Sequence, residues 1–285
     1  MQSLIAGAPV LNDIMSRKPI ALITAVLIAV LLCTAGCSNT VSGNGTSAAD
    51  NTTLLVYSGA GLKTAMTEIG EVFTEKYGIG VDYNFAGSGT LITQMELSRK
   101  GDLFIPGGTP DYRIAQGKGL VGEPGYVAYH VPVIVVAPGN PKNITSVEDF
   151  ARPGLKIALG DASTTAIGRA SDKLFQQRGI LDAVEANVVL RAPTVNEVAV
   201  AMNMGTADAA LITLDMVNPE TMEVIELPPG NGVVLIVPIG VTTFTEHQDA
   251  ARLFVEFVTS DEGKAIFVKH GFPAYPDPAY AGIEP

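Results

Sequence analysis

A unit of three parts recurs along this chain: a short apolar strand pattern, a turn of small or hydroxyl residues, and helix spacing. In the stretch NFAGSGTLI, residues 84–92, a strand that begins near Val81 ends in a glycine-serine turn, and apolar residues at helical spacing follow. Comparable turns lie at residues 58–61, 163–165 and 194–196. Repeated strand–helix units predict an α/β fold of mostly parallel sheets flanked by helices.

The turns of these units point to a ligand. In such sheets the turns lie at the carboxyl ends of the strands, where ligands bind. Each turn also starts a helix, whose first N–H groups lack intrahelical partners and whose dipole favours an anion. Taken singly, each turn is typical of ordinary N-capping, worth about 1 kcal/mol. The four together favour a small polyoxygen anion held by neutral donors, with Lys63 and Arg169 just inside helices and expected to be solvated.

Two long apolar runs, near residues 127–138 and 233–243, suggest where the chain changes lobe. Together with the family resemblance given below, they lead us to expect that lobe one contains residues 53–131 plus 240–285 and that lobe two contains residues 132–239. The two crossover strands would then form a hinge.

The N-terminal segment has the secretory pattern of a basic pair, at residues 17–18, followed by an apolar run and small residues. The run is shorter than the roughly twenty residues of a spanning helix. We predict a lipoprotein-type signal peptide at residues 1–36, with Met15 as a candidate true start, and a flexible tether at residues 37–52. The cleavage region resembles a lipobox in which Cys37 would be lipidated. Cleavage without lipid and an uncleaved anchor remain alternatives.

Charge and cysteine content argue against a disulfide-stabilised protein and against a nucleic-acid-binding protein. Both cysteines, Cys33 and Cys37, fall in the leader, so the remaining chain has no disulfide framework. Removal of residues 1–36 takes Arg17, Lys18 and Asp13 from 18 basic and 29 acidic residues, which leaves a net charge of −12. A chain this acidic is a poor partner for nucleic acid.

Catalytic and metal-binding patterns are weak. The three histidines, His130, His247 and His270, are widely separated and have no metal-ligand spacing. The carboxylates Asp161 and Asp215 have no histidine or thiolate nearby in sequence, which makes them a poor metal set. The dinucleotide and P-loop fingerprints are incomplete. We therefore expect no enzyme activity, no resident metal and no cofactor.

Six stretches in order along the chain resemble the molybdate/tungstate-binding proteins of ABC importers, within the type II periplasmic-binding-protein superfamily. They are YSGAGLKTAMTEIGEVF, FAGSGTLITQ, GDLFIPG, VPVIVVAPGNP, IALGDASTTAIGRAS and FVEFVTSDEGKAIFVKHGF. The resemblance implies an extracytoplasmic solute-binding protein that closes two lobes around molybdate or tungstate. It would deliver the oxyanion to an ABC permease driven by a cytoplasmic ATPase, and the metal would be bound only as the oxyanion.

The resemblance also implies positions for the ligand donors. The family's second-loop serine falls on Ser88, its helix-start donors on residues 165–167, and a backbone donor near Val198. Its first-loop serine falls at Gly61, so Ser58 or a backbone N–H must replace that hydroxyl. A tyrosine found in many members falls at about Thr213.

The resulting ligand-binding set combines the turn residues with these transferred positions: Ser58, Ala60, Gly61, Gly87, Ser88, Gly89, Thr165, Ala166, Ile167, Val198 and Thr213. We expect a monomer anchored by lipid at the outer side of the cell membrane, in a periplasm or on an archaeal cell surface. The alternatives are a receptor for sulfate, phosphate or another oxyanion, a secreted hydrolase or transferase, and a ligand sensor that signals to a membrane partner.

Overall fold

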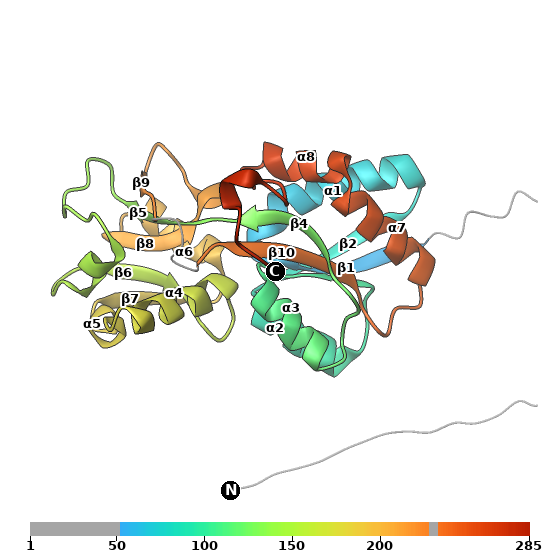
Figure 1. Cartoon of the computed structure of the whole chain (residues 1–285), viewed down its shortest axis with the longest axis horizontal. Coiled ribbons are helices and arrows are strands. Elements are labelled where there is room, and N and C mark those ends of the chain that lie inside the picture. The colour runs from blue at the N-terminus through green and yellow to red at the C-terminus, as the bar shows by residue number, and fades with distance from the viewer. Residues whose placement is uncertain (1–51, 228–232) are drawn as a thin grey trace, which may run out of the picture. The chain divides into compact units, whose positions relative to one another are not determined.

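The computed structural model describes residues 52–227 and 233–285, which belong to one compact unit. The predicted signal peptide, the lipidation position Cys37 and nearly all of the tether lie outside the described residues. Within the described ranges the strands form two five-stranded sheets, and each sheet forms the centre of one lobe (Figure 1). No helix in these ranges has the length and apolarity that a membrane crossing requires.

The sheet of lobe one has the order β2-β1-β3-β10-β4. Its strands are β1 (Thr53–Gly59), β2 (Gly80–Ala86), β3 (Leu103–Ile105), β4 (Gly125–His130) and β10 (Leu235–Val241). The strands β1, β2 and β3 pair in parallel, whereas β10 pairs antiparallel with both β3 and β4. Four of the five described strands therefore run in one direction, and β10 alone runs against them.

Helices cover both faces of this sheet. On one face lie α1 (Lys63–Tyr77), α7 (Gln248–Thr259) and α8 (Asp261–Lys269), and on the other lie α2 (Ser88–Ser98) and α3 (Thr109–Gly117) (Figure 1). In α1 the buried residues Ala65, Met66, Ile69 and Phe73 recur at helical spacing and enter the core with β1 and α7. The helix ends at Gly78, whose φ of 71° is the left-handed conformation that glycine adopts readily.

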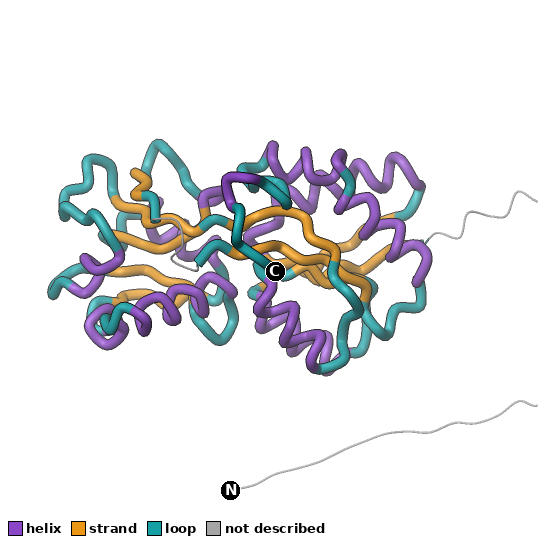
Figure 2. Tube along the Cα trace, in the orientation of Figure 1, coloured by secondary structure: helices purple, strands orange, loops and turns teal. Residues whose placement is uncertain are grey.

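The sheet of lobe two has the order β7-β6-β8-β5-β9. Its strands are β5 (Pro132–Val136), β6 (Ile157–Gly160), β7 (Val188–Ala192), β8 (Ala209–Thr213) and β9 (Glu223–Ile225). Here β5 alone runs against the other described strands. The sheet packs with α4 (Ala166–Gln177), α5 (Leu181–Glu185) and α6 (Val195–Asn203) around a separate core (Figure 2). Short 3₁₀ turns occur at Ala60–Leu62 (η1), Val147–Ala151 (η2), Leu214–Met216 (η3) and Pro278–Tyr280 (η4).

The chain passes from lobe one to lobe two at Val131, which separates β4 from β5. It returns between β9 and β10, a segment that includes residues 228–232 outside the described ranges. Sheet pairing places residues 235–239 with lobe one, although the sequence analysis assigned them to lobe two. The apolar run near 233–243 therefore belongs mainly to β10 rather than to the crossing itself.

The predicted α/β class, with mostly parallel sheets flanked by helices, is confirmed. Two short elements, α5 and β9, were not predicted. Five or three residues are too few to show a periodicity of their own, and their position depends on packing against lobe two.

Candidate functional site

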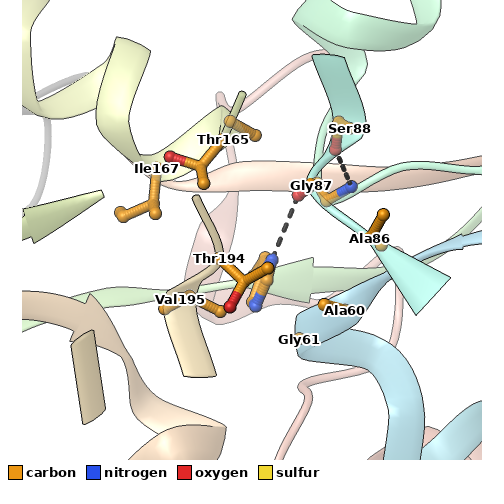
Figure 3. Close-up of a pocket in the computed structure, with 13 residues that line it drawn as sticks. Ala60, Gly61, Ala86, Gly87, Ser88, Thr165, Ile167, Thr194 and Val195 are labelled. Atoms are coloured by element: carbon orange, nitrogen blue, oxygen red, sulfur yellow. Dashed lines mark hydrogen bonds between the residues drawn. The ribbon is translucent and has the colours of Figure 1, made fainter. Parts of the chain in front are cut away.

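A cavity lies where four helix starts from the two lobes meet (Figure 3). Lobe one contributes the start of η1, which leads into α1, and the start of α2; lobe two contributes the starts of α4 and α6. The lining residues come from these turns and from two adjoining strand ends: Gly59, Ala60, Gly61, Ala86, Gly87, Ser88, Gly107, His130, Thr165, Ala166, Ile167, Thr194 and Val195.

The cavity is small. Its volume, as the space open to the centre of a water-sized sphere, is about 30 Å³. For comparison, one water molecule occupies about 10–15 Å³ as a probe sphere. In this arrangement of the lobes the cavity therefore suits a small group such as an inorganic oxyanion.

The α2 turn presents a hydroxyl. Ser88 is 3% exposed, and its Oγ accepts a hydrogen bond from the Gly107 N–H at 3.1 Å (Figure 3). Because the oxygen already accepts, the hydroxyl proton is left to donate. The hydroxyl of Ser58 lies outside the lining and donates weakly to the Gly59 carbonyl at 3.4 Å.

The α4 turn offers backbone donors rather than the predicted hydroxyl. Thr165 Oγ donates to the Asp161 carbonyl at 2.9 Å and accepts from the Gly168 N–H at 3.0 Å, so it is occupied as a helix cap. The Thr165 N–H is also bonded to the Asp161 carbonyl. The next two residues, Ala166 and Ile167, have first-turn N–H groups without an intrahelical acceptor. These two line the cavity.

The α6 turn enters the cavity earlier than the resemblance implied. Thr194 caps the helix by accepting from the Glu197 N–H at 3.4 Å, and Thr194 and Val195 line the cavity. Val198 instead lies in the second turn and is fully buried in the lobe-two core. The structure therefore does not bring Val198 to the cavity, because its N–H lies one turn beyond the helix start.

The first turn explains why a glycine occupies position 61. A Cβ added to Gly61 would lie 3.0 Å from Val195 Cγ1 and 3.4 Å from His130 Cε1, which is crowded. With no side chain there, the backbone at Ala60 and Gly61 reaches the cavity. Thr213 is the other departure from the family pattern. It is the last residue of β8, is fully buried and lies outside the lining. Its Oγ has no hydrogen-bond partner among the described residues.

The two lobes touch around the cavity. The Gly89 N–H donates across the interface to the Thr164 carbonyl at 2.9 Å, so Gly89 joins the lobes rather than lining the cavity. A Cβ added to Gly87 would lie 2.5 Å from the Pro193 carbonyl oxygen and 2.7 Å from that of Thr164. Glycine in the α2 turn therefore permits this close approach of backbone to backbone.

A second contact between the lobes joins α3 to α4. Arg169 forms an ion pair with Asp111, whose side chain is fully buried, and also donates to the Ala162 carbonyl at 2.6 Å. The expectation that Arg169 would be solvated was wrong, since its side chain is only 26% exposed. The sequence could not show this because the partners are 58 residues apart.

His130, at the end of β4, is a lining residue that the sequence analysis did not single out. It is the one ionisable side chain among the described lining residues. Its Nδ1 lies 3.1 Å from the Gly107 carbonyl oxygen, and its Nε2 lies 3.3 Å from Asp215 Oδ1. Burial lowers the pKa of His130, but the charge of Asp215 and the Gly107 carbonyl outweigh it and raise the pKa above its ordinary value.

Comparison with known proteins gives a consistent family. The chain matches the model of bacterial extracellular solute-binding proteins over residues 54–273. It is 33% identical over 223 residues to the molybdate-binding protein ModA of Mycobacterium tuberculosis H37Rv. The aligned region covers 77% of this chain and 84% of that protein. It is 25% identical over 300 residues to the sulfate-binding protein of Synechococcus elongatus, covering 93% and 83%.

A solved structure shows the same fold. The periplasmic molybdate-binding protein of Azotobacter vinelandii has a TM-score of 0.63 and 17% identity, over 77% of this chain and 98% of that one. The type II periplasmic-binding-protein fold and the resemblance drawn from the sequence are therefore confirmed, and the family is one of binding proteins rather than enzymes. With its residues 54–273 matched, the chain belongs to the bacterial extracellular solute-binding protein family.

Proposed function

We propose that the chain captures molybdate or tungstate between its two lobes and delivers it to an ABC permease and its ATPase. The observation that supports this most directly is the convergence of four helix starts on a cavity of oxyanion size. Unpaired first-turn N–H groups and the Ser88 hydroxyl supply donors, which form charge-assisted hydrogen bonds with an anion. The similarity to the Mycobacterium tuberculosis ModA protein supports molybdate as the cargo.

A cavity that offers only hydrogen-bond donors also selects anions by their protonation state. Molybdate, tungstate and sulfate carry no proton near neutral pH, so a cavity rich in donors suits all three. Hydrogen phosphate brings a proton that needs an acceptor, and the described lining contains no carboxylate. Sulfate is the second candidate, favoured by the relationship to the Synechococcus elongatus sulfate-binding protein.

Calorimetric titration tests the cargo. Residues 48–285, which form one compact unit with cores of their own, would be titrated with molybdate, tungstate, sulfate and phosphate. We expect one-to-one binding of molybdate and tungstate and no heat from phosphate. Heat from sulfate alone would change the cargo and keep the receptor, and no heat from any of the four would reject the oxyanion.

The location belongs to the same proposal. We propose that Cys37 is lipidated and that the chain acts as a monomer outside the cytoplasm, with closure of the lobes by bending at the crossing at Val131. Expression of the full chain and of Cys37→Ala, followed by fractionation, separates the alternatives. Lipidation predicts that the wild type stays with membranes and the variant is released, whereas equal membrane association would contradict it.

A further inference from the structure

His130 and Asp215 form a buried pair that joins the two lobes beside the cavity. His130 ends β4 in lobe one, and Asp215 lies in η3 directly after β8 of lobe two. Their side chains are 6% and 2% exposed. His130 lines the cavity and Asp215 does not. The imidazole therefore contacts the cavity as well as the carboxylate.

The two ring nitrogens of His130 have different surroundings. The Gly107 carbonyl, 3.1 Å from Nδ1, can only accept, so Nδ1 carries a proton. Nε2 lies 3.3 Å from Asp215 Oδ1 in an ion-pair contact that lacks hydrogen-bond geometry. With Nε2 unprotonated, the ring would be neutral and would give the buried Asp215 carboxylate no counter-charge. A second proton on the imidazole supplies that charge, in the same direction as the raised pKa of His130.

Other charged groups near β4 are engaged elsewhere. At the end of α8, which packs on β4, Lys269 and the following His270 both pair with Glu68. On α7, which also packs on β4, Arg252 and Glu256 line a separate hollow and Asp249 is exposed. After α8, Phe272 places an uncharged ring 5.4 Å from the imidazole, centroid to centroid. Asp215 is thus the charged group that contacts His130 in the described chain.

We propose that His130 is the residue that selects the charge of the ligand: as an imidazolium held by Asp215, it makes the cavity prefer a tetrahedral dianion over a monoanion of the same size. This inference rests on the proposed function, because it concerns the anion held in that cavity. The N–H and O–H donors of the turns recognise oxygen atoms and are themselves uncharged. The imidazolium of the His130–Asp215 pair carries a full charge, so it distinguishes a dianion from a monoanion more strongly than these uncharged donors do.

The proposal carries a definite pH dependence. A bound dianion stabilises the imidazolium, so binding raises the pKa of His130 further, and each pKa unit corresponds to about tenfold in affinity. Affinity is therefore highest below the pKa of the ligand-free protein. It falls as pH rises through that pKa and levels off above the pKa of the complex.

Tungstate and perrhenate are a suitable pair of probes, because both are tetrahedral oxyanions of a heavy metal with similar size and they differ in charge. Calorimetry from pH 6 to pH 9 would compare the wild type with His130→Gln. We expect the wild type to prefer tungstate and the variant to lose about tenfold or more of that preference, together with the pH dependence. The matched control is His270→Gln, whose ring also pairs with a carboxylate, at 2.8 Å, but outside the cavity.

A measurement on the wild type covers the case in which His130→Gln does not fold. Nitrogen NMR of histidine-labelled protein with tungstate bound reports the protonation of each ring nitrogen. Two protonated nitrogens on His130 at pH 7.5 support the proposal, and a neutral ring overturns it.

The outcomes separate this inference from the receptor proposal. If the wild type binds tungstate and His130→Gln keeps the same preference and pH profile, the inference is overturned and the receptor stands. If the wild type binds neither molybdate nor tungstate, both are overturned. Loss of preference in His130→Gln with no change in His270→Gln supports both.

Discussion

Ser88 provides the side-chain hydroxyl of the α2 turn at the cavity. Its oxygen is engaged by the Gly107 N–H, which fixes the rotamer and leaves the proton for a ligand. The neighbouring turns contribute backbone N–H groups, since the Thr165 hydroxyl is occupied as a cap. At the scale of residues, the proposed recognition therefore combines one oriented hydroxyl with main-chain donors.

Ser88→Ala should weaken oxyanion binding by roughly 1–3 kcal/mol, because a buried anion would lose one hydrogen bond. Calorimetry with molybdate measures this. Ser163→Ala is the matched control, since that hydroxyl donates to Asp161 and lies outside the cavity lining. Equal affinity of Ser88→Ala and the control would show that Ser88 serves only the Gly107 contact.

A proline can remove a main-chain donor without breaking a helix. Ala166 is the first residue of α4, where proline is tolerated, and Thr165 before it has φ −115° and ψ 141°, which suits a residue preceding proline. We expect Ala166→Pro to weaken molybdate binding by about 1–3 kcal/mol with little change in melting temperature. Asp261→Pro, at the first position of α8 away from the cavity, controls for the substitution itself. Unchanged affinity would remove this N–H from the site.

At the scale of elements, the cavity exists because α2 and α3 of lobe one contact the α4 region of lobe two. The Gly89 N–H bonds to the Thr164 carbonyl, and Arg169 pairs with Asp111. Neither contact involves a lining residue. Both stabilise the arrangement in which the lobes meet.

Arg169→Met should weaken ligand affinity by about 1–2 kcal/mol without touching the ligand. The change leaves Asp111 buried and unpaired when the lobes meet. The expected loss of affinity is modest because Arg169 is partly exposed, so solvent weakens its ion pair with Asp111. A double-mutant cycle with Asp111→Asn, followed by calorimetry, isolates the pair. The double variant should recover part of the loss, and strictly additive losses would show that the two side chains act independently.

The strand–turn–helix units and all four of the cavity's turns could be predicted, because a periodic pattern and a small turn are local in sequence. Val198, a position that the resemblance implied, lies outside the lining, because α6 reaches the cavity at its start with Thr194 and Val195. His130 was missed because its role arises from Asp215 and Gly107, which are distant in sequence. Periodicity assigns elements, whereas contacts between lobes decide which residue lines a cavity.

At the scale of the whole molecule, the buried His130–Asp215 pair links stability to pH. The folded-state pKa of His130 is raised above 6.5, so its contribution to stability is complete below pH 6.5 and is lost as pH rises through the folded-state pKa. The melting temperature of the wild type should therefore fall more steeply between pH 6.5 and 9 than that of His130→Gln. Parallel slopes for the wild type and His130→Gln would contradict this linkage.

The place of β10 has a consequence for the order of folding. Its residues, 235–241, lie between β3 and the edge strand β4 of the lobe-one sheet, although β3 and β4 are synthesised more than a hundred residues earlier. Lobe two needs only one continuous segment, whereas lobe one needs partners from distant parts of the chain, and such long-range pairing slows folding. Lobe one therefore cannot complete its sheet until most of the polypeptide has been made. For a chain that is proposed to act outside the cytoplasm, this delay would leave lobe one unfolded for longer while the polypeptide is made and exported.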